Sequence, residues 1–223
     1  MLYYFKVMSI RTYNQSCSLA IALDIIGERW TWLILRALLT GPKRYGEIQQ
    51  QLHGIGTNLL ADRLKALCEN GIARKSGTGR QSAYELTESG EDLRPITHQL
   101  IRWGRQFWTS QGSPGEKSAI SMPEWDMLAV EAAFLPEKAA GIQAVLQITL
   151  SGFSFHLLIK NQQCRAVIGP AIAPDVSITS DSATLLAIGR QETSVASEEE
   201  KVRLKIEGDR EMFKLLFDLF DSI

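Results

Sequence analysis

The sequence predicts a mainly helical domain that ends in a short hairpin, followed by an α+β domain with a mixed or antiparallel sheet under helices. Up to about residue 108 the apolar residues recur mostly at helical spacing, and after about residue 140 several segments alternate like strands. Between these regions, residues 109–123 (TSQGSPGEKSAISMP) are rich in Ser, Gly and Pro, as linkers are. We therefore expect a first domain over 1–110, a linker over 111–123 and a second domain over 124–223.

Composition narrows the class of protein. Hydrophobic residues make up 45% of the chain and charged residues 22%, which is typical of a globular protein. No apolar run approaches the ~18 residues of a membrane span, and residues 1–13 lack the small-residue cleavage site of a signal peptide. Three scattered cysteines form neither a disulfide framework nor a zinc motif. We expect a cytoplasmic protein with no membrane partner, no metal and no cofactor.

The two halves of the chain differ in charge. Residues 1–112 hold 14 Lys and Arg against 9 Asp and Glu, a net charge of +5, whereas residues 113–223 carry −6. Such asymmetry indicates different partners for the two halves, and only the first half suits a polyanion.

The elements expected in the first half have a recognisable order. Leu19, Leu23 and Ile26 recur at i, i+4 and i+7, which predicts a helix with one buried face. Further helices are expected over 32–39, with Thr31 as its cap, and over 45–52 and 57–69. Two strands over 72–75 and 83–86 follow, and then one long helix over about 88–108. Three helices, a tight turn between the last two and then a hairpin make a winged helix-turn-helix.

The helix over 57–69 is the predicted DNA-reading helix. Leu60, Leu64 and Leu67 fall within about 60° of one another and form its buried stripe. A helix in the major groove offers its N-terminal residues to base edges, so we expect base contacts from Thr57, Asn58, Ala61 and Lys65.

Two charged residues on this helix need separate interpretations. Asp62 would repel phosphates unless it accepts a hydrogen bond from cytosine or pairs with Arg63 or Lys65. Arg63 lies nearer the buried stripe and is as suited to bracing the fold as to touching DNA.

Cations flank the reading helix and would bind phosphates without specifying sequence. They are Lys43 and Arg44 with the adjacent Tyr45, before the first helix of the motif, and Arg74, Lys75 and Arg80 on or beside the wing. The alternatives are that this basic run is only a solvated face, or that the domain binds protein instead of DNA.

Short motifs follow one another in a characteristic order over residues 12–108: CSL at 17–19, ALDIIGERWT at 22–31, LILR at 33–36, LTGPKRYGEI at 39–48, NGI at 70–72, YELT at 84–87 and LRP at 93–95. These motifs carry a resemblance of the first half to the HxlR-type transcription regulators. It implies a bacterial homodimer that is built from the first and last helices of this domain and binds operator DNA.

The residues themselves allow that dimer. A continuous apolar stripe follows the long helix, and with Leu19 it forms our expected interface: Leu93, Ile96, Leu100, Trp103 and Phe107. The alternative is that the stripe covers its own domain.

The chain also departs from the family pattern. Gly56 stands where the family usually has Ser, Asn58 where it has a basic residue and Ala61 where Thr is common, so an operator known for a relative does not transfer. Cys17 matches a family cysteine that senses oxidants in some members, but Ser18 replaces the usual Pro. A redox role for Cys17 is therefore one reading, and a small semi-buried thiol is the other.

The second half is expected to begin with a helix over 124–138. Strands over 142–150, 153–160, 164–168 and 176–179 follow, then a helix over 182–188, a strand around 202–206 and a closing helix capped by residues 207–209. This order is similar to the sterol-carrier-protein-like fold, with local echoes at PDVSIT (174–179), LL (185–186) and IEGD (206–209).

That resemblance implies an apolar tunnel for a lipid or acyl-like molecule, which would make a small apolar ligand a partner. The lining we expect is Phe155, Leu157, Ile178, Leu185, Phe213, Leu216 and Phe217. An ordinary core explains the same apolar helix equally well.

The sequence thus predicts a DNA-binding transcription regulator that acts as a homodimer. No catalytic motif is present, so we do not expect an enzyme. The remaining alternative is a lipid carrier in which the winged helix serves only to dimerise.

Overall fold

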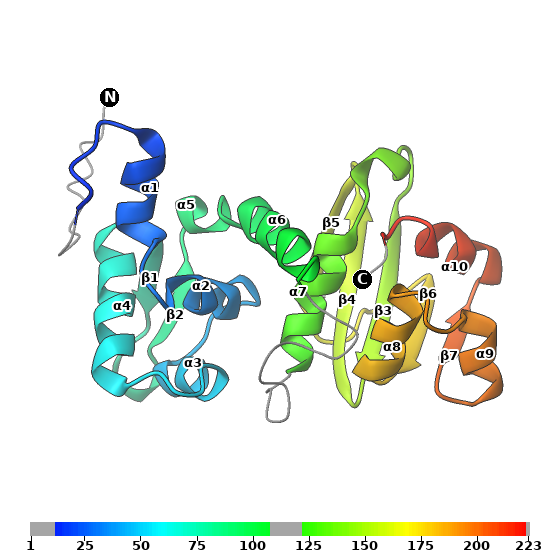
Figure 1. The fold of residues 1–223 in the computed structure, drawn as a ribbon. Coiled ribbons are helices and arrows are strands. Elements are labelled where there is room, and N and C mark those ends of the chain that lie inside the picture. Colours follow the sequence, from blue (N-terminus) through cyan, green and yellow to red (C-terminus); the bar gives the residue numbers. More distant parts are fainter. Residues whose placement is uncertain (1–11, 108–121, 222–223) are drawn as a thin grey trace. The chain divides into compact units, whose positions relative to one another are not determined.

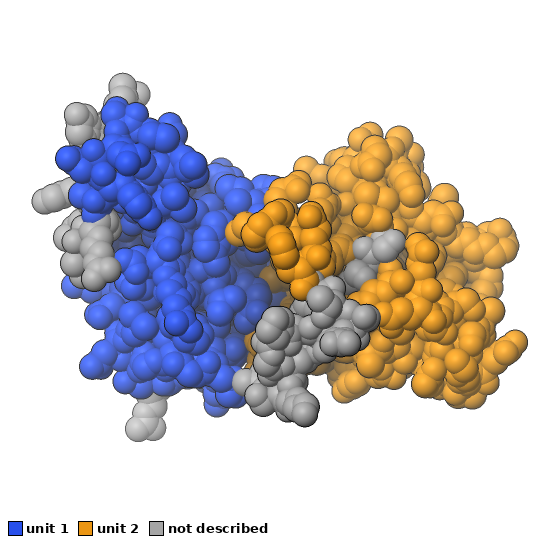
Figure 2. Space-filling model, in the orientation of Figure 1, with its two compact units in different colours: residues 1–97 blue, residues 98–223 orange. Residues whose placement is uncertain are grey.

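The computed structural model describes residues 12–107 and 122–221. Contacts divide the chain into two compact units, Met1–Thr97 and His98–Ile223 (Figure 2). The division falls inside helix α6 (Arg94–Arg105), whose first turn belongs to the first unit. The boundaries that we expected at residues 110 and 124 stay a prediction, since most of the residues between them lie outside the described ranges.

The first unit is a winged helix-turn-helix, as predicted (Figure 1). Its helices and strands are α1 (Ser18–Ile26), α2 (Thr31–Leu39), α3 (Tyr45–Gln51), α4 (Thr57–Glu69), β1 (Ala73–Ser76), the 3₁₀ turn η1 (Gly79–Gln81), β2 (Ala83–Leu86), α5 (Glu88–Glu91) and the start of α6. Strands β1 and β2 pair antiparallel and form the wing.

Helix α4 has the bounds and the buried face that its leucines predict. Leu60, Leu64 and Leu67 lie in the core of the first unit, each at most 2% exposed. After Asn70, Gly71 takes a φ of +71°, which a glycine adopts without steric cost, and the Ile72 N–H then donates to the Leu67 carbonyl. This buried stripe fixes which side of α4 remains free.

The expected long helix over 88–108 is instead two helices. Thr87 accepts a hydrogen bond from the Gly90 N–H and so caps the short α5. In a continuous helix the next turn would need an N–H at position 95, and Pro95 has none, so the chain breaks before α6. Gly90 packs closely here, because a Cβ on it would lie 2.1 Å from the Ile72 carbonyl oxygen.

Two expectations at the start of the chain are wrong. Thr31 is the first residue of α2 and not its cap, and Trp30 before it has a φ of +79°. In α1 only Ile26 of the expected apolar face is buried, whereas Leu19 and Leu23 are exposed. The helical spacing predicted the helix correctly, but no described part of the chain covers the apolar side chains of Leu19 and Leu23.

The second unit places helices on a five-stranded sheet (Figure 1). Its elements are α7 (Pro123–Ala133), the 3₁₀ turn η3 (Pro136–Lys138), β3 (Ala144–Leu150), β4 (Phe153–Lys160), β5 (Gln163–Ile168), β6 (Val176–Ser180), α8 (Ser182–Gly189), α9 (Val195–Glu200), β7 (Lys205–Gly208) and α10 (Arg210–Phe217). The order is β5-β4-β3-β6-β7, and only β3 and β6 pair in parallel, so the α+β class with a mixed sheet is confirmed.

Two boundaries and one helix in this unit differ from expectation. The first helix ends at Ala133, and Pro136 then opens the separate turn η3. Helix α9 was not expected, because VASEEE shows no apolar periodicity. Val202 is 89% exposed with a φ of +59°, so it does not belong to the last strand, which begins at Lys205.

Strand β4 shows how the sheet builds its core. Phe155, Leu157 and Ile159 point to the helix-covered face and are buried, together with Met127 of α7 and Leu216 of α10. The alternate residues of the strand lie on the opposite face.

Replacing Leu157 by Ala is expected to lower the free energy of unfolding by about 2–5 kcal/mol, because a side chain with no exposed surface leaves a cavity. Its neighbour Leu158 is 41% exposed and provides the matched control, for which we expect less than about 1 kcal/mol. Urea titration followed by circular dichroism measures both. Equal losses for the two variants would contradict the assigned face of β4.

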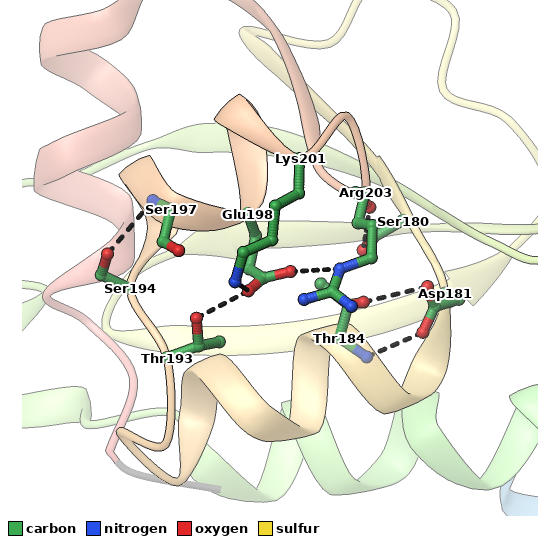
Figure 3. A network of polar contacts seen from close by, with 9 residues as sticks. All are labelled: Ser180, Asp181, Thr184, Thr193, Ser194, Ser197, Glu198, Lys201 and Arg203. Carbon is green, nitrogen blue, oxygen red and sulfur yellow. Dashed lines mark hydrogen bonds and ion pairs between the residues drawn. The ribbon is translucent and has the colours of Figure 1, made fainter.

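A network of polar contacts fastens α9 to the rest of the second unit (Figure 3). The Glu198 side chain, 1% exposed, accepts from Thr193 Oγ1 at 2.6 Å, Lys201 Nζ at 3.1 Å and Arg203 Nε at 2.6 Å. The Arg203 carbonyl in turn accepts from Ser180 Oγ at 2.8 Å. These hydrogen bonds, foremost that from Arg203, lower the pKa of Glu198 to about 2.

This pKa predicts a pH dependence of stability. A carboxylate with a depressed folded-state pKa stabilises the fold above its ordinary value of 4.5, and that contribution is lost as the pH falls from 4.5 towards about 2. We expect Glu198→Gln to lower the melting temperature at pH 7 and to flatten the decline of the melting temperature across this acid range. Glu200→Gln, at an exposed residue of the same helix, should match the wild type. An unchanged acid profile in Glu198→Gln would contradict the role of the network.

Candidate nucleic-acid interface and apolar cavity

The free side of α4 carries the four residues predicted to read DNA. Thr57, Asn58, Ala61 and Lys65 are all exposed. No side chain caps the start of the helix at Gly56, so its first N–H groups are available to water or to an anion. The structure therefore brings these residues together on one polar surface.

Helix α3 is joined to the start of α4 by a tyrosine. Tyr45 Oη donates to the Thr57 carbonyl oxygen at 2.7 Å, which places the predicted contact residue Tyr45 directly beside the reading helix. Arg44, just before α3, is exposed, and its backbone N–H donates to Glu47 at 2.6 Å. The start of α3 is thereby held beside the start of α4, with the Arg44 cation next to it.

Among the predicted phosphate contacts whose side chains the structure describes, Lys43 is the one that is not brought to this surface. It is 8% exposed, and its backbone pairs with Tyr84 of the wing through two hydrogen bonds. The sequence motif suggested a free cation, but the bridge to β2 draws this position into the fold.

The two cations of α4, Arg63 and Lys65, form ion pairs with residues other than Asp62. Arg63 forms an ion pair with Glu28 at 2.8 Å, so it braces the fold. Lys65 lies 3.7 Å from Glu69, and its side chain is 74% exposed. An exposed pair of this kind contributes little, which leaves Lys65 able to exchange its partner for a phosphate or a base.

The wing supplies two further cations among the described side chains. Arg74 pairs with Glu85 across the hairpin at 2.8 Å, and Lys75 lies 5.8 Å from the centre of the Tyr84 ring. Both are exposed. The backbone of Arg80 lies in η1, but its side chain is outside the described part of the structure.

Most of the predicted dimer stripe is exposed. Ile96, Leu100, Trp103 and Phe107 are between 42% and 61% exposed, and Leu19 of α1 is exposed as well. Leu93 is the exception, because it packs against the core of its own unit. Ile21 and Leu33 are also exposed apolar residues, which sequence periodicity did not single out. The interface itself stays a prediction.

Cys17 precedes α1 and is exposed. The backbone N–H groups of Ala20 and then of Leu19 lower the pKa of its thiol, whereas burial raises the pKa of Cys68 and Cys164. The semi-buried thiol that we weighed for position 17 is thus wrong, and a redox role stays a prediction.

The second unit contains a cavity of about 330 Å³. Five of the expected residues line it, namely Ile178, Leu185, Phe213, Leu216 and Phe217. Phe155 and Leu157 do not, although they belong to the same core. Leu146 and Ile148 of β3 complete the apolar floor, and Lys138, Gln191 and Asp218 add polar groups that sequence reasoning missed.

Searches of the described residues for two other kinds of site are negative. No group of His, Cys, Asp and Glu side chains in residues 12–107 and 122–221 could hold a metal ion. Within the same ranges no helix has the length and apolar character needed to cross a membrane.

Each half of the chain matches a known protein family. The profile of the HxlR-like helix-turn-helix family matches residues 25–112, and that of the SCP-2 sterol transfer family matches residues 127–221. The HTH-type transcriptional regulator YodB of Bacillus subtilis is 36% identical over 89 residues, which are 39% of this chain and 80% of YodB. The regulator YkvN of the same organism is 30% identical over 108 residues, 47% of this chain and 92% of YkvN.

Solved structures of the same kind resemble the first half. The quinone-bound YodB of B. subtilis covers 40% of this chain and 97% of its own, with 35% identity and a TM-score of 0.36. The redox regulator HypR in its reduced form covers 40% and 92%, with 28% identity and a TM-score of 0.39. From the sequence relatives and the matching profiles, the chain belongs to the HxlR-like helix-turn-helix family, whose relatives are transcriptional regulators, and carries an SCP-2 sterol transfer domain behind it.

Proposed function

We propose that the protein is a regulator that binds a specific double-stranded operator in the cytoplasm, where bacterial DNA lies. The observation that carries this proposal is the free face of α4, where Asn58, Ala61 and Lys65 are exposed opposite a fully buried leucine stripe. Asn can bond adenine through two hydrogen bonds, Ala can pack on a thymine methyl group, and Lys can reach guanine or phosphate. Arg44, Arg74 and Lys75 would bind the backbone and set the orientation.

We propose that the regulator acts as a homodimer. The stripe of Ile96, Leu100, Trp103 and Phe107 leaves large apolar side chains in water, and Trp103 packs edge-on against Phe107 with ring centres 4.8 Å apart. A second copy of the chain fits this stripe best, because a two-fold axis lets one apolar surface cover its own equivalent.

We further propose that a small apolar ligand in the cavity of the second unit modulates the regulator. Ile178, Leu185 and Phe213 give the cavity an apolar lining, and its volume of about 330 Å³ falls in the range of ligand sites. This cavity also favours the second candidate function, a lipid carrier whose winged helix only dimerises. The carrier predicts negligible DNA affinity at low salt, whereas the regulator predicts tight binding there.

Selection from a pool of random DNA duplexes tests the proposal. The full chain should enrich an inverted repeat whose half-sites lie about 34–36 Å apart, one turn of the duplex, because a symmetric dimer presents two α4 helices to successive major grooves. Recovery of unenriched sequences at low salt would contradict sequence-specific binding and favour the carrier.

A further inference from the structure

Helix α6 has two opposite faces with different contacts. Its apolar stripe follows positions 96, 100 and 103 and continues into Phe107 in the turn after the helix, and His98, Arg102 and Arg105 recur at i, i+4 and i+7 on the other side. At about 100° per residue the centres of the two rows lie roughly 200° apart. One row is exposed apolar surface, and the other consists of titratable side chains.

The polar row fastens α6 to the end of α7. Arg102 donates from Nε to the Ala132 carbonyl and from Nη2 to the Phe134 carbonyl, at 2.5 and 2.9 Å. His98 Nε2 lies 3.9 Å from a carboxylate oxygen of the buried Glu131. These contacts hold the last turn of α7 and the residues behind it against α6.

The segment that Arg102 holds is also a wall of the cavity. Leu135 N–H donates to the Leu219 carbonyl and Asp221 N–H to the Ala133 carbonyl, each at 2.8 Å, so the end of α7 pairs antiparallel with the end of the chain. Leu135, Phe220 and Asp221 line the cavity from this paired segment. Burial lowers the pKa of the Arg105 guanidinium of α6, and the Asp221 carboxylate opposes this shift.

We propose that occupancy of the cavity changes the strength of the dimer through Arg102. This inference rests on the proposed function, because it takes the exposed stripe of α6 as the contact between copies. The cavity volume of about 330 Å³ lies at the lower end of the range for ligand sites, and Leu135 and Phe220 line it, so an apolar chain that fills it pushes against these two side chains. Arg102 follows this movement because it is hydrogen-bonded to the neighbouring Ala132 and Phe134 carbonyls. Since Arg102 belongs to α6, the helix moves with it, and the apolar face of α6 shifts against the second copy.

The test measures the dimer dissociation constant of the full chain by sedimentation equilibrium, with and without dodecan-1-ol as an uncharged apolar probe. Ile178→Phe in β6 and Leu185→Phe in α8 fill the cavity with a side chain, so they test the effect of occupancy without any probe. For the wild type with probe, and for the filled variants, we expect a shift of at least about fivefold, the lower end of typical coupling between sites.

Arg102→Gln should still fold and dimerise. The probe should then shift its dimer dissociation constant by less than about twofold, because Gln cannot bridge the two carbonyls. Lys160→Gln, which removes an exposed charge elsewhere in the same unit, should keep the full shift. Hydrogen exchange of the Leu135 and Asp221 amides reports whether the wall responds to the probe in each variant.

Two results would overturn the inference and leave the regulator proposal standing. The first is a DNA-binding dimer whose dissociation constant changes neither with dodecan-1-ol nor in the two filled-cavity variants. The second is an equal shift of the dissociation constant in the wild type and in Arg102→Gln. A wild-type chain that is monomeric or does not bind DNA without any probe would instead remove the proposed function, and the inference with it.

Discussion

Operator affinity is expected to fall by about 10³–10⁵-fold when the salt concentration rises from 50 to 200 mM. A dimer with about 6–10 phosphate contacts releases that many condensed counterions when it binds, and salt opposes their release. The whole chain has a net charge of −1, so this effect depends on cations gathered at the first unit: Arg44, Lys65, Arg74 and Lys75. Fluorescence anisotropy of a labelled operator measures the slope.

Single variants test which cations are responsible. Arg44→Ala removes one contact from each copy, so the slope of log affinity against log salt should become shallower by about 2. Lys160→Ala removes an exposed charge from the second unit and should leave the slope unchanged. A wild-type slope near zero would show that phosphate contacts do not hold the complex together.

Trp103→Glu is expected to convert the dimer to a monomer and to reduce operator affinity by about 10²–10⁴-fold, the gain that linking two binding modules provides. Trp103 is 60% exposed in the single chain, so the substitution should leave the fold intact while placing a carboxylate in the apolar contact. Sedimentation and anisotropy measure the two effects.

Leu158→Glu places the same charge on an exposed apolar position of β4 and should leave both properties at wild-type values. A Trp103→Glu variant that remains dimeric, with normal circular dichroism, would show that the α6 stripe is not the interface.

The elements that periodicity predicts best are those whose apolar face is buried within their own unit. Helix α4 matches expectation at both ends because Leu60, Leu64 and Leu67 pack inside and Gly71 ends the helix. In α1 the same kind of pattern misled us, because Leu19 forms an apolar face that the described chain leaves exposed. Periodicity identifies an apolar face but not what covers it.

The candidate site was only partly predictable for a similar reason. Lys43 resembles a free cation in the sequence, but long-range pairing with Tyr84, which no local pattern encodes, buries it. Alternation into the sheet interior predicted the cavity residue Ile178, but it also selected Phe155 and Leu157, which lie in the core without lining the cavity. Polar lining residues such as Lys138 were missed. Helix α9 was missed because its sequence has no apolar periodicity. Its buried residue is Glu198, which is held by Thr193 and Arg203 outside the helix.

The most direct test of DNA reading by α4 is the affinity of Asn58→Ala for the selected operator at fixed salt. Asn58 is exposed on the free face, and loss of a bidentate base contact should cost about 1–3 kcal/mol and relax the preferred base at one position of each half-site. Gln163→Ala removes an exposed amide from β5 and should bind as the wild type does. If Asn58→Ala keeps wild-type affinity and the same base preference at every position, and Ala61 and Lys65 variants do likewise, α4 does not read the operator.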